Sequence, residues 1–330
     1  MSSFLARRFG FTLVILVLIS VITFGIFFWL SPDPAVSICG KACTPATIGT
    51  IREQLGLDRP FFVQYAQFVT DFFTGSTYGT GPTAVRCSFP CLGFSFQTHQ
   101  AVWAMIASRL PVSITVAVGA AVTWLLAGVI GGVLGGVKEG TWWDRGALVV
   151  ALGSISLPNY FVALILQYLL VVQLQILPFP SAVTFGEDPL RWFETYLMPW
   201  LVLGFGYAAM YLRLVRTNVI DTLNENFYRT ARAKGLPTSL VLRRHALRPA
   251  LTPVVTMFGM DFAALLGGAI IVETVFGLNG VGKLTADSIT KNDQPVIMGV
   301  TLLVACFVVV ANLVVDVLYT ALDPRVRTSG

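Results

Sequence analysis

The chain has 330 residues, of which 55% are hydrophobic and only 12% are charged, and its mean hydropathy is +0.75. A soluble domain usually carries about 25% charged residues, so this chain has too few charges to cover a water-facing surface of its size. The net charge of +5 does not indicate a nucleic-acid partner, because the basic residues occupy the gaps between apolar runs. We therefore predict an all-α integral membrane protein in contact with membrane lipid.

The first apolar run, residues 9–30, contains 22 residues without a charge and follows Arg7 and Arg8. As a helix it is about 33 Å long, which is enough to cross a bilayer core of about 30 Å. A cleaved signal peptide is the alternative, but its apolar region is normally only about 7–15 residues long. We therefore predict that residues 1–30 form a cytoplasmic N-terminus and a retained first transmembrane helix.

Residues 31–108 separate the first two predicted transmembrane helices, and we assign them to a small extracytoplasmic segment. Residues 47–73 predict two short amphipathic helices that are separated at Asp58-Arg59-Pro60. Four of the five cysteines in the chain lie in this segment, in two C-x3-C pairs. A metal or cluster site is one interpretation of such pairs, but disulfide bonds in an oxidising compartment are favoured. The connectivity stays open for the disulfide candidates Cys39, Cys43, Cys87 and Cys91.

Five further apolar runs follow, at residues 110–137, 146–177, 196–212, 252–276 and 295–322. We therefore predict six transmembrane helices, with residues 109–330 forming a five-helix core. If the N-terminus is cytoplasmic, 14 of the 22 Lys and Arg residues fall in the inner segments 1–8, 138–145, 213–248 and 323–330. This asymmetry follows the positive-inside rule and predicts a multi-pass protein with both termini in the cytoplasm.

The cytoplasmic loop at residues 213–253 predicts a helix that lies outside the membrane. The stretch 224–234 is helical in character and is followed by Gly235 and Pro237, which end helices. Phe227 and Tyr228 are apolar anchors among arginines, and this composition is typical of a protein–protein contact. A solvated basic loop without a partner is the simpler alternative.

The stretch YRTARAKG at residues 228–235, followed by HALRP at 245–249, resembles the EAA loop of ABC importer permeases. The motifs GLDRP at 56–60, ETVF at 273–276 and DPR at 323–325 extend the resemblance to the peptide/nickel permease family, in its dipeptide and oligopeptide branch. The resemblance covers most of the chain and implies a type I ABC importer permease. Residues 34–45 and 75–93, which contain the four cysteines, depart from the family pattern.

The family resemblance implies the partners of the chain in a bacterial or archaeal cytoplasmic membrane. They are a second related permease subunit, two ABC ATPase subunits and an extracytoplasmic solute-binding protein. ATP and Mg would be bound by the ATPase subunits, because the near match to a P-loop at 277–284 ends in Leu284 instead of Ser or Thr. We therefore expect no enzyme activity, cofactor or metal site in this chain. The ATPase-coupling residues would be Glu225, Phe227, Tyr228, Arg229, Ala231, Arg232, Lys234 and Gly235.

Polar residues inside the predicted spans are candidates for the pathway or its gate, because an ionised side chain in the bilayer tends to face protein or water. Contacts between helices are the alternative role. These candidates are Asn159, Asp261, Glu273, Asn312 and Asp316. The rows of small residues at Gly128, Gly132 and Gly136 predict close helix packing.

The resemblance favours inward transport of dipeptides or oligopeptides after delivery by the binding protein. Import of nickel or another small solute within the same family is an alternative. An autonomous secondary transporter is a second alternative, although its expected internal repeats are not evident.

Overall fold

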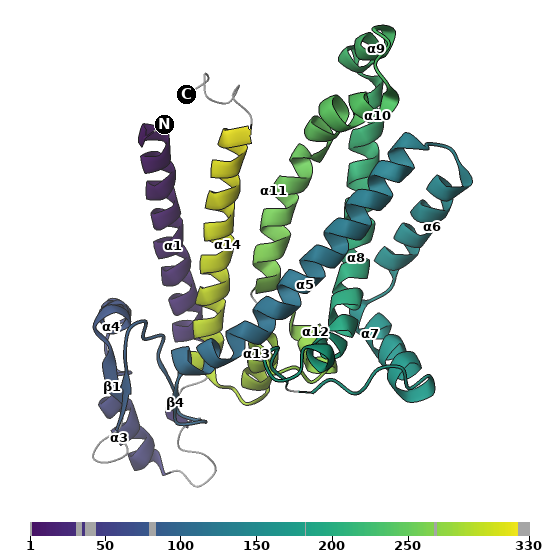
Figure 1. Cartoon of the computed structure of the whole chain (residues 1–330). Helices are drawn as coiled ribbons and strands as arrows, with labels where there is room; N and C mark the ends of the chain where they lie inside the picture. Colours follow the sequence, from purple (N-terminus) through teal and green to yellow (C-terminus); the bar gives the residue numbers. More distant parts are fainter. Residues whose placement is uncertain are drawn as a thin grey trace.

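The computed structural model describes residues 2–30, 35–36, 44–78, 84–181, 183–266 and 269–322. Helices dominate these residues (Figure 1). The helices before the loop are α1 (Ser2–Leu30), α3 (Pro45–Leu55), α4 (Phe61–Thr74), α5 (Val102–Val137), α6 (Trp142–Ser156), α7 (Asn159–Gln167) with the π-helical η3 (Tyr168–Gln173), and α8 (Pro189–Asn224). The later ones are α9 (Asn226–Ala233), α10 (Thr238–Val241) with the π-helical η4 (Leu242–Ala246), α11 (Leu247–Leu266), α12 (Ile270–Val275), α13 (Val281–Thr290) and α14 (Gln294–Leu322).

Five helices among the described residues are long and apolar enough to cross a membrane, at Arg7–Trp29, Val102–Val137, Pro189–Asn224, Leu247–Leu266 and Gln294–Val315. A sixth span results if the bent pair Trp142–Ser154 and Asn159–Gln173 is counted as one. The prediction of an all-helical protein with six spans is therefore confirmed in outline.

Two of the predicted spans differ from the structure in their course. The third is broken at Pro158, where α6 and α7 meet at 100°, because a proline lacks the N–H of a helix and disfavours helical backbone in the preceding residue. The fifth does not continue to Phe276 as one helix, because α11 is described to Leu266, Ala269 is not helical, and α12 is a separate short helix.

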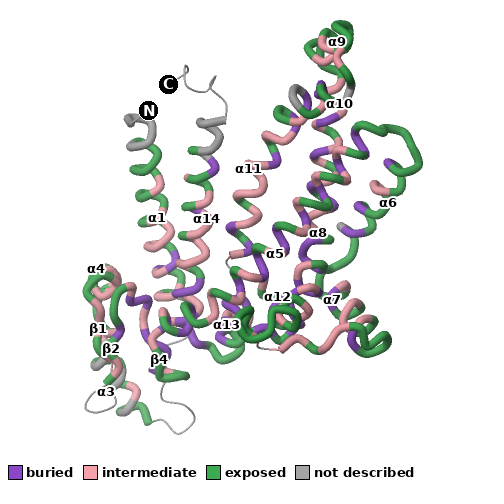
Figure 2. The backbone as a smooth tube through the Cα atoms, viewed as in Figure 1, coloured by how far each residue is buried: buried purple, intermediate pink, exposed green. Residues whose placement is uncertain are grey.

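The core of the bundle is the pair of helices α5 and α8, whose buried residues are purple in Figure 2. A Cβ atom added to Gly132 would lie 2.6 Å from the Cβ of Val215 and 2.7 Å from the carbonyl oxygen of Leu212. Gly128 and Gly136 meet Tyr211 and Val219 in the same way, one turn away on either side. The absence of side chains on this row lets the two helices approach closely, as the sequence predicted.

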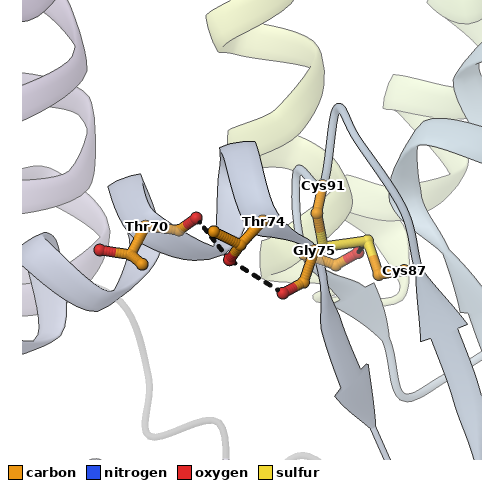
Figure 3. Close-up of a disulfide and its surroundings, with 6 residues drawn as sticks. Thr70, Thr74, Gly75, Cys87 and Cys91 are labelled. Atoms are coloured by element: carbon orange, nitrogen blue, oxygen red, sulfur yellow. Dashed lines mark hydrogen bonds between the residues drawn. A yellow bond between two sulfur atoms is a disulfide. The ribbon is translucent and has the colours of Figure 1, made fainter.

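The segment between α1 and α5 contains α3 and α4, the two helices predicted there, and two short antiparallel strand pairs. Strand β1 (Ser76–Tyr78) pairs with β2 (Val85–Cys87), and β3 (Phe94–Ser95) pairs with β4 (Gln100–Ala101). Cys87 and Cys91 form a disulfide, and the hydroxyl of Thr74 donates to the carbonyl oxygens of Thr70 and Gly75 at the end of α4 (Figure 3). The other two disulfide candidates, Cys39 and Cys43, lie outside the described residues.

The ends of the bundle are clearly different in Figure 1. The start of α1, the end of α14 and the helix α9 lie at one end, and α3 with β1 lies at the opposite end. We refer to these as the α9 end and the α3 end of the molecule.

Candidate functional site

The helix α9 projects beyond the membrane-spanning helices at the α9 end (Figure 1). It follows α8 after a single residue, Glu225, whose extended backbone (φ −70°, ψ 149°) turns the chain and whose carbonyl oxygen accepts from the amides of Tyr228 and Arg229. No residue of α9 is buried, and Phe227 is 45% exposed. The predicted coupling residues therefore form one projecting element with an accessible apolar side chain.

The charge on this element is mainly positive, because Arg229, Arg232 and Lys234 are exposed and only Glu225 is acidic. Tyr228 and Ala231 are half-buried, so the apolar positions are accessible only in part. A surface with an aromatic residue among arginines has the composition of a protein–protein contact.

Gly235 ends α9 in the left-handed region, with φ at +80°. Its amide donates to the carbonyl oxygen of Arg232. A Cβ atom at Gly235 would meet nothing within 4 Å, so the requirement for glycine is one of backbone conformation and not of space. The chain then continues through α10 and η4 into α11, which leads back into the bundle.

A buried ion pair that the sequence analysis missed lies near the α9 end of the bundle. The guanidinium of Arg216 on α8 donates to both carboxylate oxygens of Asp144 on α6, at 2.5 and 2.8 Å, and the Asp144 side chain is only 2% exposed. The amide of Gly140 donates to the same carboxylate. This pair fixes the start of α6 against α8. The residues are 72 positions apart, so sequence spacing does not connect them.

Asn159 is exposed on the wall of a cavity of about 760 Å³, between the break of α6 and α7 and the helices α8 and α11. The cavity wall is mixed in character. Besides Asn159, it includes Tyr207, Met210, Arg213, Asn218 and Met257. This location is compatible with the predicted role of Asn159 in a pathway.

Asp261 joins two helices. The hydroxyl of Tyr211, which is fully buried on α8, donates to the Oδ2 atom of Asp261 on α11 over 2.7 Å. This is the contact between helices that the sequence analysis gave as the alternative to a pathway role.

Glu273 is fully buried on α12 and does not line an open surface of this chain. Its Oε1 atom accepts from the hydroxyl of Ser113 on α5 over 2.7 Å, and its Oε2 atom accepts from the amide of Lys283 on α13 over 3.0 Å. The hydroxyl oxygen of Ser113 in turn accepts from the amide of Val281. The predicted pathway role therefore does not fit Glu273, because its carboxylate is enclosed and connects α12, α13 and α5.

The remaining pathway candidates lie on α14. Asn312 is exposed. Asp316 belongs to the same helix, and its side chain lies outside the described part of the chain.

The structure thus defines a multi-pass helical bundle with a short basic helix that projects from one end. Comparison with known families identifies the class of membrane protein. Residues 125–328 match the binding-protein-dependent transport system inner membrane component, and residues 1–117 match the N-terminal part of such membrane components. The chain belongs to this family, whose members are membrane subunits of ABC importers and are not enzymes.

Relatives cover nearly the whole chain. A putative peptide transport system permease protein of Brucella abortus (strain 2308) is 33% identical over 327 residues, which are 99% of both chains. A glutathione transport system permease protein of Salmonella choleraesuis (strain SC-B67) is 35% identical over 314 residues, 94% of both chains. The predicted family is thereby confirmed, and the alternative of an autonomous secondary transporter is rejected.

Proposed function

We propose that this chain is one of two related permease subunits of an ABC importer that carries peptides into the cell. The proposal of a peptide substrate is supported by relatives of this length that are named as peptide and glutathione transport permeases. ATP and Mg are bound by two partner ATPase subunits, and a solute-binding protein delivers the peptide.

The observation that carries the proposal is the projecting helix α9. Its exposed Phe227 and basic residues offer a docking surface for an ATPase, and its direct junction with α8 connects that surface to the bundle. Closure of the ATPase dimer on ATP then moves α9 together with the end of α8.

The proposed orientation places the α9 end in the cytoplasm. The start of α1, the end of α14 and α9 lie at this same end (Figure 1). The segments that the sequence assigns to the inner side carry most of the Lys and Arg residues, and α9 belongs to one of them. Both termini are then cytoplasmic, and α3 and the strands lie at the extracytoplasmic side. The cavity beside Asn159 is then part of the translocation pathway.

Coupling is tested with the variants Gly235→Val and Gly277→Val in the complete importer, reconstituted in liposomes with binding protein outside and ATP inside. The two glycines are matched, because φ is +80° and +66° and an added Cβ atom meets nothing within 4 Å at either position. Each substitution strains the backbone by about 1–3 kcal/mol. We expect Gly235→Val to abolish ATP-driven uptake of a labelled dipeptide, and Gly277→Val, which lies after α12 and away from α9, to retain it.

Equal uptake by both variants would reject α9 as the coupling element. Uptake of nickel or another small solute by the unmodified importer, without uptake of peptides, would reject the peptide substrate and leave the coupling role intact. Gentle-detergent co-purification then tests the partners, since loss of the ATPase only from the Gly235→Val complex places its docking surface on α9.

A further inference from the structure

The helix α4 and the loop that follows it expose aromatic side chains to an unusual extent. Phe62, Phe73 and Phe89 are 79%, 64% and 62% exposed, and we call these three residues the aromatic face. Phe62 and Phe73 are eleven residues apart, which is three helical turns, so they share one side of α4. The ring of Phe89 stacks on that of Phe73 at a centroid distance of 6.2 Å.

The other apolar side of α4 is packed against α1. Phe61 stacks on Trp29 with ring centroids 4.8 Å apart, and the ring of Phe24 lies 5.5 Å from that of Tyr65 and 5.4 Å from that of Phe68. These contacts fix the level of α4 along the membrane-spanning helix.

The helix α4 therefore lies beside the membrane-spanning part of α1 and not beyond its end. The candidate span of α1 ends at Trp29, so Phe24 is about 7.5 Å and Ser20 about 13.5 Å inside it at the helical rise of 1.5 Å per residue. The hydroxyl of Tyr65 reaches that of Ser20, over 3.4 Å. A bilayer core is about 30 Å thick, so α4 lies beside the half of α1 that occupies the leaflet at the α3 end.

The exposed surface of α1 indicates that lipid covers the aromatic face. Only 11% of the α1 span is buried within the described protein, and its exposed side chains include Ile22, Ile26 and Trp29. Phe62 continues this surface, because its ring lies 5.3 Å from that of Phe61, which covers Trp29. Helices that lie in the membrane interface carry Trp, Phe or Leu on the face that is buried at the boundary of the acyl chains.

We propose that α4 is inserted in the leaflet at the α3 end, with the aromatic face in contact with phospholipid. The polar side chains of the helix fit this placement. Gln64 and Gln67 lie on a different side of the helix from Phe62 and Phe73. The side-chain amide of Gln64 donates to the carbonyl oxygens of Leu57 and Arg59, and the Arg59 guanidinium donates to the side-chain oxygen of Gln67. The helix therefore has the amphipathic division of an element lying in the interface.

The disulfide between Cys87 and Cys91 helps to position the aromatic face. Cys87 and Cys91 close the loop that carries Phe89, and the amide of Cys91 donates to the carbonyl oxygen of Phe72 at the end of α4. Gly75 allows this approach, since a Cβ atom there would lie 2.5 Å from the carbonyl oxygen of Cys87 (Figure 3). Residues 84–93, which belong to a segment that departs from the family pattern, thus hold Phe89 beside Phe73 and enlarge the lipid contact.

The test uses the full chain in nanodiscs of phosphatidylcholine and phosphatidylglycerol. A trifluoromethyl-phenylalanine is placed at Phe62, Phe73 or Phe89, and its ¹⁹F line broadening is measured with dissolved oxygen, which partitions into lipid, and with a water-soluble gadolinium chelate. Phe227 is the control for an aromatic side chain in water, since it is 45% exposed on α9. Phe94 is the control for a side chain covered by protein, since it is 7% exposed.

We expect the ratio of oxygen broadening to chelate broadening at Phe62 and Phe73 to be several-fold higher than at Phe227, and Phe89 to follow Phe73. A ratio like that of Phe227 would show that the aromatic face lies in water and would overturn the proposal. Weak broadening by both reagents, as at Phe94, would show that protein covers the face and would overturn it equally. The result does not depend on whether the importer carries peptides.

Discussion

The close contact between α5 and α8 allows a quantitative prediction of how a substitution changes the stability of the helical bundle. In the variant Gly132→Ala, the added Cβ atom would lie 2.6 Å from the Cβ of Val215 and 2.7 Å from the carbonyl oxygen of Leu212. Carbon atoms in contact are normally about 3.5–4.0 Å apart, so the shortfall is about 1 Å. Neither neighbouring atom can move by a rotamer change, since one is a Cβ atom and the other is backbone. The helices must therefore separate along the whole glycine row.

Such overpacking typically costs about 1–3 kcal/mol. Gly153→Ala is the matched control, because Gly153 is also in a helix, α6, and its added Cβ atom would meet nothing within 4 Å. Its expected effect is a gain of up to about 1 kcal/mol from helix propensity. Gly131→Ala should fall between the two, because the Cδ1 atom of Leu212, 2.8 Å away, is the end of a flexible side chain.

The assay is unfolding of the purified chain in mixed micelles, followed by far-ultraviolet circular dichroism as the fraction of sodium dodecyl sulfate is raised. We expect the midpoints to rank Gly153→Ala highest, then Gly131→Ala, then Gly132→Ala. A Gly132→Ala variant as stable as Gly153→Ala would refute the packing argument, since the two helices would then separate without cost.

Further variants at two buried polar contacts are tested by the same titration. Asp144→Asn leaves the Arg216 guanidinium without its counter-charge and should cost about 3–5 kcal/mol; adding Arg216→Gln should recover part of this loss, and strictly additive losses would contradict a direct pair. Glu273→Ala removes the acceptor of the Ser113 hydroxyl and the Lys283 amide and should cost about 2–4 kcal/mol, whereas Glu273→Gln retains an acceptor oxygen and should cost less. Equal losses for the two Glu273 variants would show that the hydrogen bonds are not what the carboxylate contributes.

The elements that could be predicted from the sequence are those with a strong local signal. The spans follow from apolar runs that are long enough to cross a bilayer, and the end of α9 follows from Gly235 and Pro237. The packing role of Gly132 also follows from spacing, because small residues at intervals of four share one helix face. Each of these signals lies within a single segment.

The features that could not be predicted depend on contacts between distant segments. In the sequence, Asp144 is simply one charged residue of a predicted cytoplasmic turn. Only the packing of α6 on α8 brings it to Arg216. The sequence indicates that Glu273 is a carboxylate inside the membrane. Its hydrogen bonds from the Ser113 hydroxyl and the Lys283 amide form only when α12 and α13 fold back on α5. A proline such as Pro158 indicates a kink, but the 100° break between α6 and α7 depends also on what α7 packs against.

These contacts also define how a force on α9 enters the bundle under the proposed function. Only Glu225 separates α9 from α8, so displacement of α9 acts directly on the end of α8. The glycine row couples α8 closely to α5, and the ion pair of Asp144 and Arg216 couples it to the start of α6. These three helices therefore move as one unit at the α9 end. The break at Pro158 lets α7 follow a different course, and the cavity beside Asn159 adjoins that break. Under the proposed function, closure of the ATPase subunits therefore changes the shape of this cavity most directly.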